Sequence, residues 1–358
     1  MSEDDKIHYV DWRRLRDFAT EALTKVDVPR EDAAIIADTL VEADLRGIDT
    51  HGILRLAPYM KMFSEGNINP RPNLYIVKET PITAVIDADD AAGNVASFKA
   101  AEIAIQKAKN SGVGIVGVKN STHNCMLAYY PMMALKHDMI GLMTTNAPPQ
   151  VPAYGGLTKI LSTNPYAAAI PAGDELPVVV DMASTLVALG KVRLSATLGK
   201  KIPLGWGLDE NGEPTEDPNA ILKGGFLAWL GGPKGYSLAV LANILSGVLT
   251  GGSFGPQNFP PYSTAEYGNQ LIREGHFIMV LSIDSFMPID EFKRRMDAMI
   301  RETKASELAK GFKRIYLPGE PEFEQKEQRL KTGIPISQPL WEDLLRVQRK
   351  LELSSSLE

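Results

Sequence analysis

The segment 44–59 contains the side chains best suited to chemistry. His51, Arg55 and Tyr59 follow one another there at four-residue spacing, and Thr50, with the aspartate before it, can cap a helix that begins at this point. Residues at positions i, i+4 and i+8 of an α-helix lie on roughly one face, so an imidazole, a guanidinium and a phenol would lie side by side. A guanidinium holds a carboxylate, and an imidazole exchanges protons near neutral pH. The spacing predicts a site for a small acid, although a solvated helix face often has the same composition.

Two further titratable residues follow predicted strands. His123 comes shortly after the apolar run 113–118, and Asp181 comes directly after the run 178–180. Catalytic groups often lie at such strand ends, on loops that a rigid scaffold holds. For His123 the alternative is a hydrogen-bonded structural histidine. Asp181 can orient an imidazole, bind ribose hydroxyls or cap the next helix.

Two glycine-rich segments are candidate phosphate sites. Residues 112–117 read Gly-Val-Gly-Ile-Val-Gly, which matches the dinucleotide fingerprint G-x-G-x-x-G. The fingerprint binds a pyrophosphate where it follows a strand and begins a helix, whereas here a helical pattern precedes it and a strand pattern follows. We therefore expect a helix C-cap, with Gly112 or Gly114 at positive φ. In residues 231–236, glycines let the backbone approach a ligand and Lys234 offers a charge to a phosphate, the alternative being an exposed loop lysine.

Helical patterns at both ends of the chain enclose a centre of short apolar runs. Apolar residues recur at helical spacing in residues 12–26, 33–43, 290–310 and 339–351. The central runs, bounded by turn residues, are typical of buried strands. They are Thr83–Ile86, Val113–Val118, Ile140–Met143, Ala167–Ile170, Val178–Val180 and Phe277–Ile283. Ala96–Lys109 and Tyr236–Leu249, between the runs, have helical patterns.

This order of elements predicts an α/β fold with a mixed, α+β type of sheet. We expect the two helical ends to pack together into one discontinuous domain, formed by residues 1–72 and 288–358. Residues 73–287 would then form a mixed α/β core that binds cofactor and substrate and is open to further subdivision. At 358 residues, the chain is long enough for about two such cores.

Composition excludes several classes of protein. The net charge of −6 argues against nucleic acid as the main partner. The sequence has no uninterrupted apolar run of about 18 residues, so no membrane span is expected. The single cysteine, Cys125, excludes an intramolecular disulfide and a multi-cysteine zinc site, so we expect no metal. Acidic residues near Met1 are unlike a signal peptide. Together these features predict a cytoplasmic protein.

Several short motifs carry a family resemblance. They are Asn120-Ser121-Thr122-His123, Thr145-Asn146-Ala147-Pro148-Pro149, Tyr154-Gly155-Gly156, Thr163-Asn164-Pro165, Val180-Asp181-Met182-Ala183-Ser184, Gly190-Lys191 and Gly231-Gly232-Pro233-Lys234-Gly235-Tyr236. With these motifs and the segment 44–59, the chain resembles the malate/lactate dehydrogenase family of the second type, over about residues 8–335.

The resemblance implies a cofactor, an assembly and a set of binding residues. It implies a non-Rossmann fold that binds NAD or NADP, and a homodimer or dimer-based assembly with its active site between domains. The residues implied to contact the cofactor are His123, Asn146, Thr163, Asn164, Asp181, Met182, Ala183, Lys234, Gly319 and Glu320.

The predicted function is the interconversion of a small 2-hydroxy acid and its 2-oxo acid by hydride transfer. Arg55 would hold the substrate carboxylate, with Thr50 and Tyr59 completing the pocket wall, while His123 exchanges the hydroxyl proton and His51 polarises the same oxygen. His51 competes with His123 for the proton role, and Asp181 would assist. One departure from the family is Cys125, which stands where relatives usually have a glycine.

Other functions fit the same residues. One is a reductase of a cyclic imine carboxylate or of a sugar-derived keto acid. A lyase or hydrolase without a cofactor would use the two histidines and Asp181. A non-catalytic binding protein on an old enzyme fold is a further alternative. Oxidation of NADH or NADPH by a panel of 2-oxo acids separates the dehydrogenase from the last two.

Overall fold

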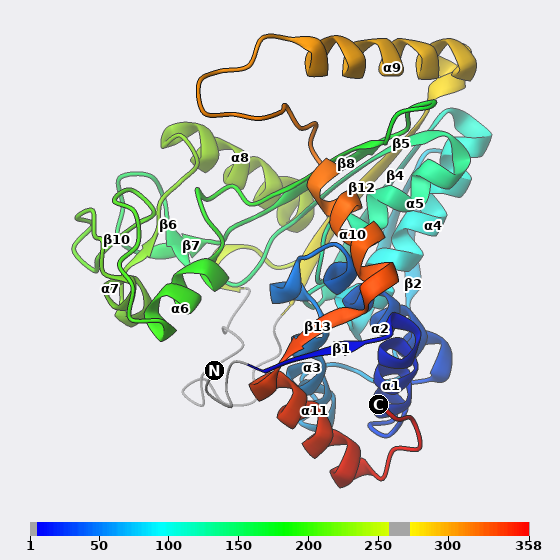
Figure 1. Ribbon diagram of the computed structural model, residues 1–358. Coiled ribbons are helices and arrows are strands. Elements are labelled where there is room, and N and C mark those ends of the chain that lie inside the picture. The colour runs from blue at the N-terminus through cyan, green and yellow to red at the C-terminus, as the bar shows by residue number, and fades with distance from the viewer. Residues whose placement is uncertain (1–5, 258–272, 358) are drawn as a thin grey trace.

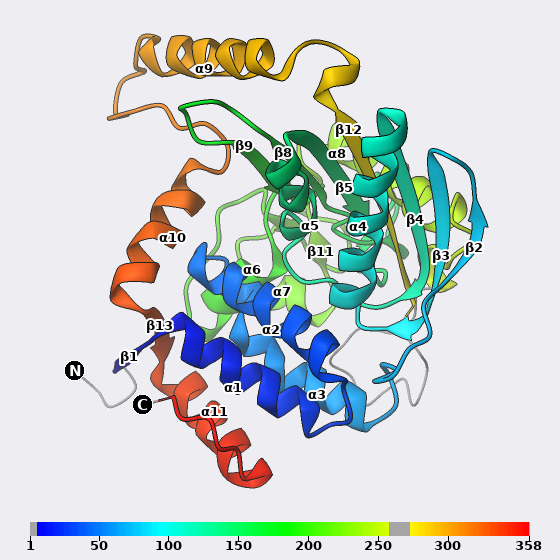
Figure 2. The same ribbon diagram turned by 90° about the vertical axis from the view of Figure 1, so that its right-hand side faces the viewer.

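The computed structural model describes residues 6–257 and 273–357. At its centre lies a seven-stranded mixed sheet, which confirms the predicted sheet type (Figures 1 and 2). Its strands, from edge to edge, are β2 (Tyr75–Glu79), β3 (Thr83–Ala91), β4 (Val113–Ser121), β12 (Glu274–Ser282), β5 (Met139–Thr145), β8 (Tyr166–Ile170) and β9 (Val178–Met182). β3 and β4 are parallel, and the other neighbouring pairs are antiparallel.

Each of the six predicted apolar runs falls in one of these strands, with Ile283 alone overrunning the end of its strand. Burial explains the agreement, because buried and half-buried residues alternate at the start of β4 and of β5 and three successive residues of each strand are then buried. The edge strand β2 escaped prediction because all five of its side chains are exposed. A strand without a buried face carries no apolar alternation to detect.

The segment 112–117 connects a helix to a strand, as its context predicted. Helix α4 (Gly93–Ser111) ends at Gly112, whose φ of 81° is left-handed, and β4 begins at the next residue. Gly114 allows α4 and β4 to pack closely, since a Cβ there would lie 1.9 Å from the Ala104 carbonyl oxygen. Backbone packing therefore explains glycines 112 and 114, and the segment does not begin a helix.

Both ends of the chain contribute to one core. Its elements are α1 (Trp12–Thr24), α2 (Arg30–Leu45), α3 (Leu56–Ser64), α11 (Gln338–Leu351) and the two-stranded sheet of β1 (Ile7–Val10) and β13 (Ile334–Ser337). The rings of His8 and Trp341 stack at 4.3 Å across this junction. Residues 1–5, which bear on the signal-peptide prediction, lie outside the described residues.

Helix α9 (Ile289–Ala305) lies apart from these terminal helices and crosses the opposite end of the molecule (Figures 1 and 2). It ends at Ala305, earlier than the predicted 310, and buried Asp297 ties it to backbone N–H groups of residues 173–175. Helix α10 (Glu320–Thr332) returns the chain to α2. The division into domains 1–72 with 288–358 and 73–287 stays a prediction.

A second core lies under the sheet and a third core forms a separate lobe. Helices α4 and α5 (Tyr129–Met133) cover the sheet in the second core. The lobe, at the left of Figure 1, contains β6 (Val151–Pro152), β7 (Lys159–Leu161), α6 (Leu189–Thr197), β10 (Gly207–Leu208), α7 (Pro218–Lys223), β11 (Phe226–Leu227) and α8 (Pro233–Asn243). None of the helices in residues 6–257 and 273–357 has the length and apolar character needed to span a membrane.

Candidate active site

The segment 44–59 does not form the single helix that its spacing predicted. Two 3₁₀ turns, η2 (Asp49–His51) and η3 (Ile53–Arg55), precede α3, and Gly52 between them is extended. Buried Asp44 causes the break. Its Oδ2 accepts a hydrogen bond from Ile53 N at 2.7 Å, and a Cβ on Gly52 would lie 1.7 Å from its Oδ1.

The predicted cap at Asp49 and Thr50 is also wrong. The Asp49 carboxylate forms an ion pair with Arg329 of α10 instead, and the Thr50 hydroxyl contacts His51 Nδ1 at 2.9 Å. Arg329 thus joins α10 to the turn that carries His51. This connection was invisible in the sequence because the two residues are 280 positions apart.

The structure nevertheless brings two of the predicted catalytic residues, His51 and His123, together with Tyr59, which was predicted to bind the substrate. Tyr59 Oη and His123 Nδ1 share a hydrogen bond of 2.7 Å, and the rings of His51 and His123 stack at 5.6 Å. His123 reaches this place because it follows the end of β4, whereas the other two come from the terminal helical core. Two cores therefore meet at a pair of imidazoles.

The electrostatics of this cluster favour neutral imidazoles. Loss of hydration and then the positive charge of Arg55 lower the pKa of His51 to about 4. The same two causes, together with His51, hold the pKa of His123 well below its ordinary value. Arg55 is half-buried, and its Nε donates a hydrogen bond of 2.8 Å to the Thr50 carbonyl oxygen. Near pH 7 both histidines are proton acceptors beside a fixed cation.

Cys125 lies directly beneath this cluster. Its Sγ–H donates to the His51 carbonyl oxygen, and burial raises the pKa of the thiol to about 12. A thiol of that pKa stays protonated, so Cys125 lacks the thiolate of a nucleophilic cysteine. The residue instead supports the backbone of the turn at His51.

Asp181 lies at the end of β9 and contacts the segment that follows His123. Its Oδ2 accepts a hydrogen bond of 2.9 Å from Ala128 N, five residues beyond His123. Although the side chain reaches solvent, the surrounding protein atoms raise the pKa of Asp181 to about 6. A carboxyl group with this pKa changes charge close to neutral pH.

Several segments with predicted cofactor contacts converge beyond Asp181. Ser184, three residues later, donates its backbone N–H to the Thr163 carbonyl oxygen at 2.7 Å and its hydroxyl to the Asn164 carbonyl oxygen at 2.6 Å. The Ser184 carbonyl oxygen accepts from Leu230 N at 3.0 Å, next to the glycine loop 231–235. Met182 and Ala183 lie between these anchor points, with Met182 39% exposed.

The glycine loop begins helix α8 and fits a phosphate. Gly231 and Gly232 have φ values of 59° and 64°, and Pro233 and Lys234 form the first turn of the helix with the Lys234 side chain exposed. The N–H groups and dipole of a helix N-terminus attract anions. Nearby, Asn164 Oδ1 is buried without a hydrogen-bond partner among the described residues, so it is available to a donor. These residues fit a dinucleotide.

Two other predicted cofactor residues already use their side chains within the protein. The amide of Asn146 accepts from Gly275 N at 2.8 Å and donates to the Ser253 carbonyl oxygen at 2.8 Å. Buried Glu320 accepts from Leu317 N at 2.9 Å and pairs with Lys304. Gly319 packs against β9, where a Cβ would lie 2.8 Å from that of Val179. In this structure Asn146 and Glu320 thus have partners within the protein, and Gly319 is a packing position.

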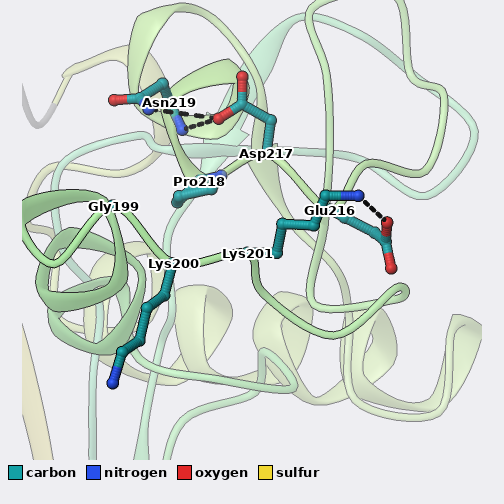
Figure 3. A pocket seen from close by; sticks show the side chains of 7 residues that line it. All are labelled: Gly199, Lys200, Lys201, Glu216, Asp217, Pro218 and Asn219. Atoms are coloured by element: carbon teal, nitrogen blue, oxygen red, sulfur yellow. Dashed lines mark hydrogen bonds and ion pairs between the residues drawn. The ribbon is translucent and has the colours of Figure 1, made fainter.

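A surface hollow of about 470 Å³ lies elsewhere in the lobe (Figure 3). Its lining residues are Gly199, Lys200, Lys201, Glu216, Asp217, Pro218 and Asn219, with an ion pair of 2.9 Å between Lys201 and Glu216. None of the predicted site residues is among these.

Comparison with known proteins shows which protein family the chain belongs to. The sequence pattern of the family described as malate/L-lactate dehydrogenase matches residues 10–345. The chain belongs to this family. The resemblance seen in the ordered motifs is confirmed, and it extends over nearly the whole chain.

Three relatives illustrate the range of the family. A malate dehydrogenase of Pyrococcus horikoshii is 40% identical over 94% of this chain and 94% of its own length. A ureidoglycolate dehydrogenase (NAD(+)) of Escherichia coli is 35% identical over 90% of this chain and 91% of its own. The solved structure of the sulfolactate dehydrogenase of Methanocaldococcus jannaschii superimposes with a TM-score of 0.89 at 39% identity, covering 97% of this chain and 98% of that one.

Two features of the site were not predicted from the sequence. Asp44 shapes the turn at His51, and Arg193 of α6 lies close enough for the charge of Arg55 to lower its pKa, in addition to the effect of burial. Asp44 stood in the first motif but looked like an ordinary polar helix residue. Arg193 gave no signal, because only the folded chain brings the lobe to the terminal helices.

Proposed function

We propose that this enzyme interconverts a small 2-hydroxy acid, of the malate or lactate type, and its 2-oxo acid by hydride transfer to or from NAD or NADP. Family membership confirms the broad class, a 2-hydroxy acid oxidoreductase that uses a nicotinamide nucleotide. The observation that carries the proposal is the cluster of Tyr59, His51 and His123 beside Arg55. It combines a proton acceptor with a carboxylate-binding cation.

In the proposed mechanism Arg55 holds the substrate carboxylate, and Thr50 and Tyr59 form the adjacent wall. His123 exchanges the proton of the C2 oxygen, while His51 polarises that oxygen. Because the pKa of His123 is lowered, its imidazole is ready to accept the hydroxyl proton during oxidation. Binding of the substrate anion beside Arg55 weakens the repulsion that opposes a protonated His123, which prepares the reverse reaction.

The cofactor would lie along β9 and the N-terminus of α8. Lys234 and the glycine loop would bind its phosphates, Thr163 and Asn164 would contact it beside them, and Asp181, Met182 and Ala183 would face its nicotinamide half. When bound, the nicotinamide supplies or accepts the hydride. This arrangement would hold a dinucleotide without a Rossmann fingerprint, supported from behind by Asn146, Gly319 and Glu320.

We also propose a homodimer or dimer-based assembly in the cytoplasm. Exposed apolar side chains on and just after α6 and α8 would be covered by a second copy, among them Leu194 and Leu249 at 60% and 62% exposure. Light scattering should report a dimer or a multiple of it at micromolar concentration. A monomer under those conditions would contradict the assembly.

Absorbance at 340 nm tests the activity directly. Oxidation of NADH or NADPH in the presence of a 2-oxo acid panel supports the proposal and identifies the preferred cofactor. Absence of turnover with every acid and both nucleotides would show that the proposed reaction is wrong.

The cofactor site has its own test in Lys234→Ala. Loss of a phosphate contact weakens binding equally in the ground state and the transition state, so the cofactor KM should rise about tenfold while kcat changes little. Lys200→Ala, in the hollow of Figure 3, is a matched control that should leave the cofactor KM unchanged. An unchanged cofactor KM in Lys234→Ala would remove this loop from the cofactor site.

A further inference from the structure

The lobe brings a second arginine to the substrate side of the site. The first turn of α6 packs against Thr50, since a Cβ on Gly190 would lie 2.9 Å from Thr50 Cγ2. Arg193 follows Gly190 by three residues and therefore lies on the same face of the helix. The carbonyl oxygen of Thr50 also accepts the hydrogen bond from Arg55 Nε. Arg55, from the segment before α3, and Arg193, from α6 of the lobe, thus both lie near Thr50.

Within the part of the chain that the structure describes, neither Arg55 nor Arg193 forms an ion pair with a carboxylate. The acidic residues of the neighbouring segment are engaged elsewhere, Asp44 with Ile53 N and Asp49 with Arg329. Although Arg193 is exposed, nearby protein atoms reduce its hydration and lower its pKa, and the positive charge of Arg55 lowers that pKa further. Two like charges held in this way are stabilised by an anion between them.

We infer that Arg193 binds a second anionic group of the substrate, so that the preferred substrate is a 2-hydroxy or 2-oxo acid with a carboxylate or sulfonate at its far end. The inference rests on the proposed function, because it places the first carboxylate on Arg55. A planar guanidinium suits either group, since both present oxygens for paired hydrogen bonds. Arg193 is exposed on the face of α6 that packs against Thr50, so its long side chain can reach the end of the substrate remote from C2.

A pair of acids of equal length tests this inference. Oxaloacetate and 2-oxobutyrate differ in that a methyl group replaces the far carboxylate. The unmodified enzyme should prefer oxaloacetate in kcat/KM, and Arg193→Met should lower the ratio of the two kcat/KM values by about 10–100-fold, the weight of a lost charge-assisted contact. Arg193→Lys, which keeps the charge without the fork, should give an intermediate ratio.

Two further variants calibrate the result. Arg55→Met should lower kcat/KM for both acids, because both have the carboxylate next to C2. Lys200→Met removes one positive charge just beyond the end of α6 and should leave the ratio unchanged. If Lys200→Met changed the ratio as much as Arg193→Met, a general charge effect would explain both and the inference would be wrong.

The remaining outcomes separate this inference from the proposed function. Turnover of both acids with an unchanged ratio in Arg193→Met would overturn the role of Arg193 and leave the oxidoreductase reaction standing. A rise in the KM of NADH or NADPH, without a change in ratio, would assign Arg193 to the cofactor and also overturn the inference. If the unmodified enzyme turned over neither acid, nor any other 2-oxo acid, the proposed function would fail and this inference with it.

Discussion

Two neighbouring histidines, His276 and His123, differ in how completely the protein encloses them. His276 lies inside the sheet on β12, completely buried, with Nε2 bonded to Ser121 Oγ at 2.9 Å and Nδ1 to Thr145 Oγ1 at 2.8 Å. His123 lies just beyond the end of β4, half-buried, with Tyr59 Oη at its Nδ1. Burial lowers the pKa of both. A lowered pKa therefore does not identify a catalytic histidine, and access to a substrate does.

The largest expected effect is a difference in kcat between variants of His123 and of His276. His123→Asn should lower kcat by about 10²–10⁴-fold, the usual weight of general acid–base catalysis, with little change in the cofactor KM. His276→Gln, measured at a temperature where it is folded, should lower kcat by less than about threefold because both ring nitrogens serve the sheet. Steady-state kinetics of both variants test the comparison, and equal losses would break it.

His51 provides the check on which imidazole moves the proton. In the oxidation direction the base must be unprotonated, so kcat/KM should fall as the pH drops below the lowered pKa of His123. If His51→Asn abolished this acid limb while His123→Asn preserved it, the two histidines would exchange roles.

The second expected effect concerns stability in acid. His276 has a pKa of about 3 in the folded state, while a histidine in an unfolded chain titrates near 6.5. Between these values the unfolded state binds more protons, so the free energy of unfolding falls as the pH decreases from about 6.5 toward 3. This single group contributes up to about 1.4 kcal/mol per pH unit to that slope.

His276→Gln should therefore flatten the dependence of stability on pH, although it lowers stability at pH 7. Urea unfolding at several pH values between 4 and 7 measures both. Asp181, with its pKa raised to about 6, acts with the opposite sign over part of this range, so the variant is compared with the unmodified protein. An unchanged slope would mean that His276 takes up its proton at the same pH in the folded and the unfolded state.

A smaller loss than that of His123→Asn is expected at the partner of His123. Tyr59→Phe removes the hydroxyl at Nδ1 but keeps the ring in its core position, so kcat should fall about tenfold, the value of one hydrogen bond. Single-turnover measurements would show whether the loss lies in chemistry. A drop as large as that of His123→Asn would instead make Tyr59 a proton donor in its own right.

The sequence predicted best where a local pattern decides the structure. The run Val113–Val118 gave a buried strand, and the reversed context of Gly112 correctly indicated a helix C-cap. The sequence predicted less well where residues distant in the chain determine the structure. β12 inserts between β4 and β5, whose residues lie more than a hundred positions earlier, and no local periodicity records such a neighbour.

The same distinction applies to the site. His51, Tyr59 and His123 could be singled out from the sequence because they stand in recognisable motifs. The single helix predicted to align His51, Arg55 and Tyr59 does not form, because the carboxylate of Asp44 holds Ile53 N and leaves no space beside Gly52. Arg193 was missed because nothing near it in the chain reports that its lobe meets the terminal helices.

The pairing of β1 with β13 has a consequence for the order in which the protein matures. Tyr59 belongs to a core that includes Trp341 and Leu344 of α11, and a strand from each end of the chain closes that core. During synthesis the sheet strands emerge long before residues 334–351 do. We expect the nascent chain to acquire its fold around the sheet first and its catalytic competence only once residues 334–351 have emerged and β13 can pair with β1.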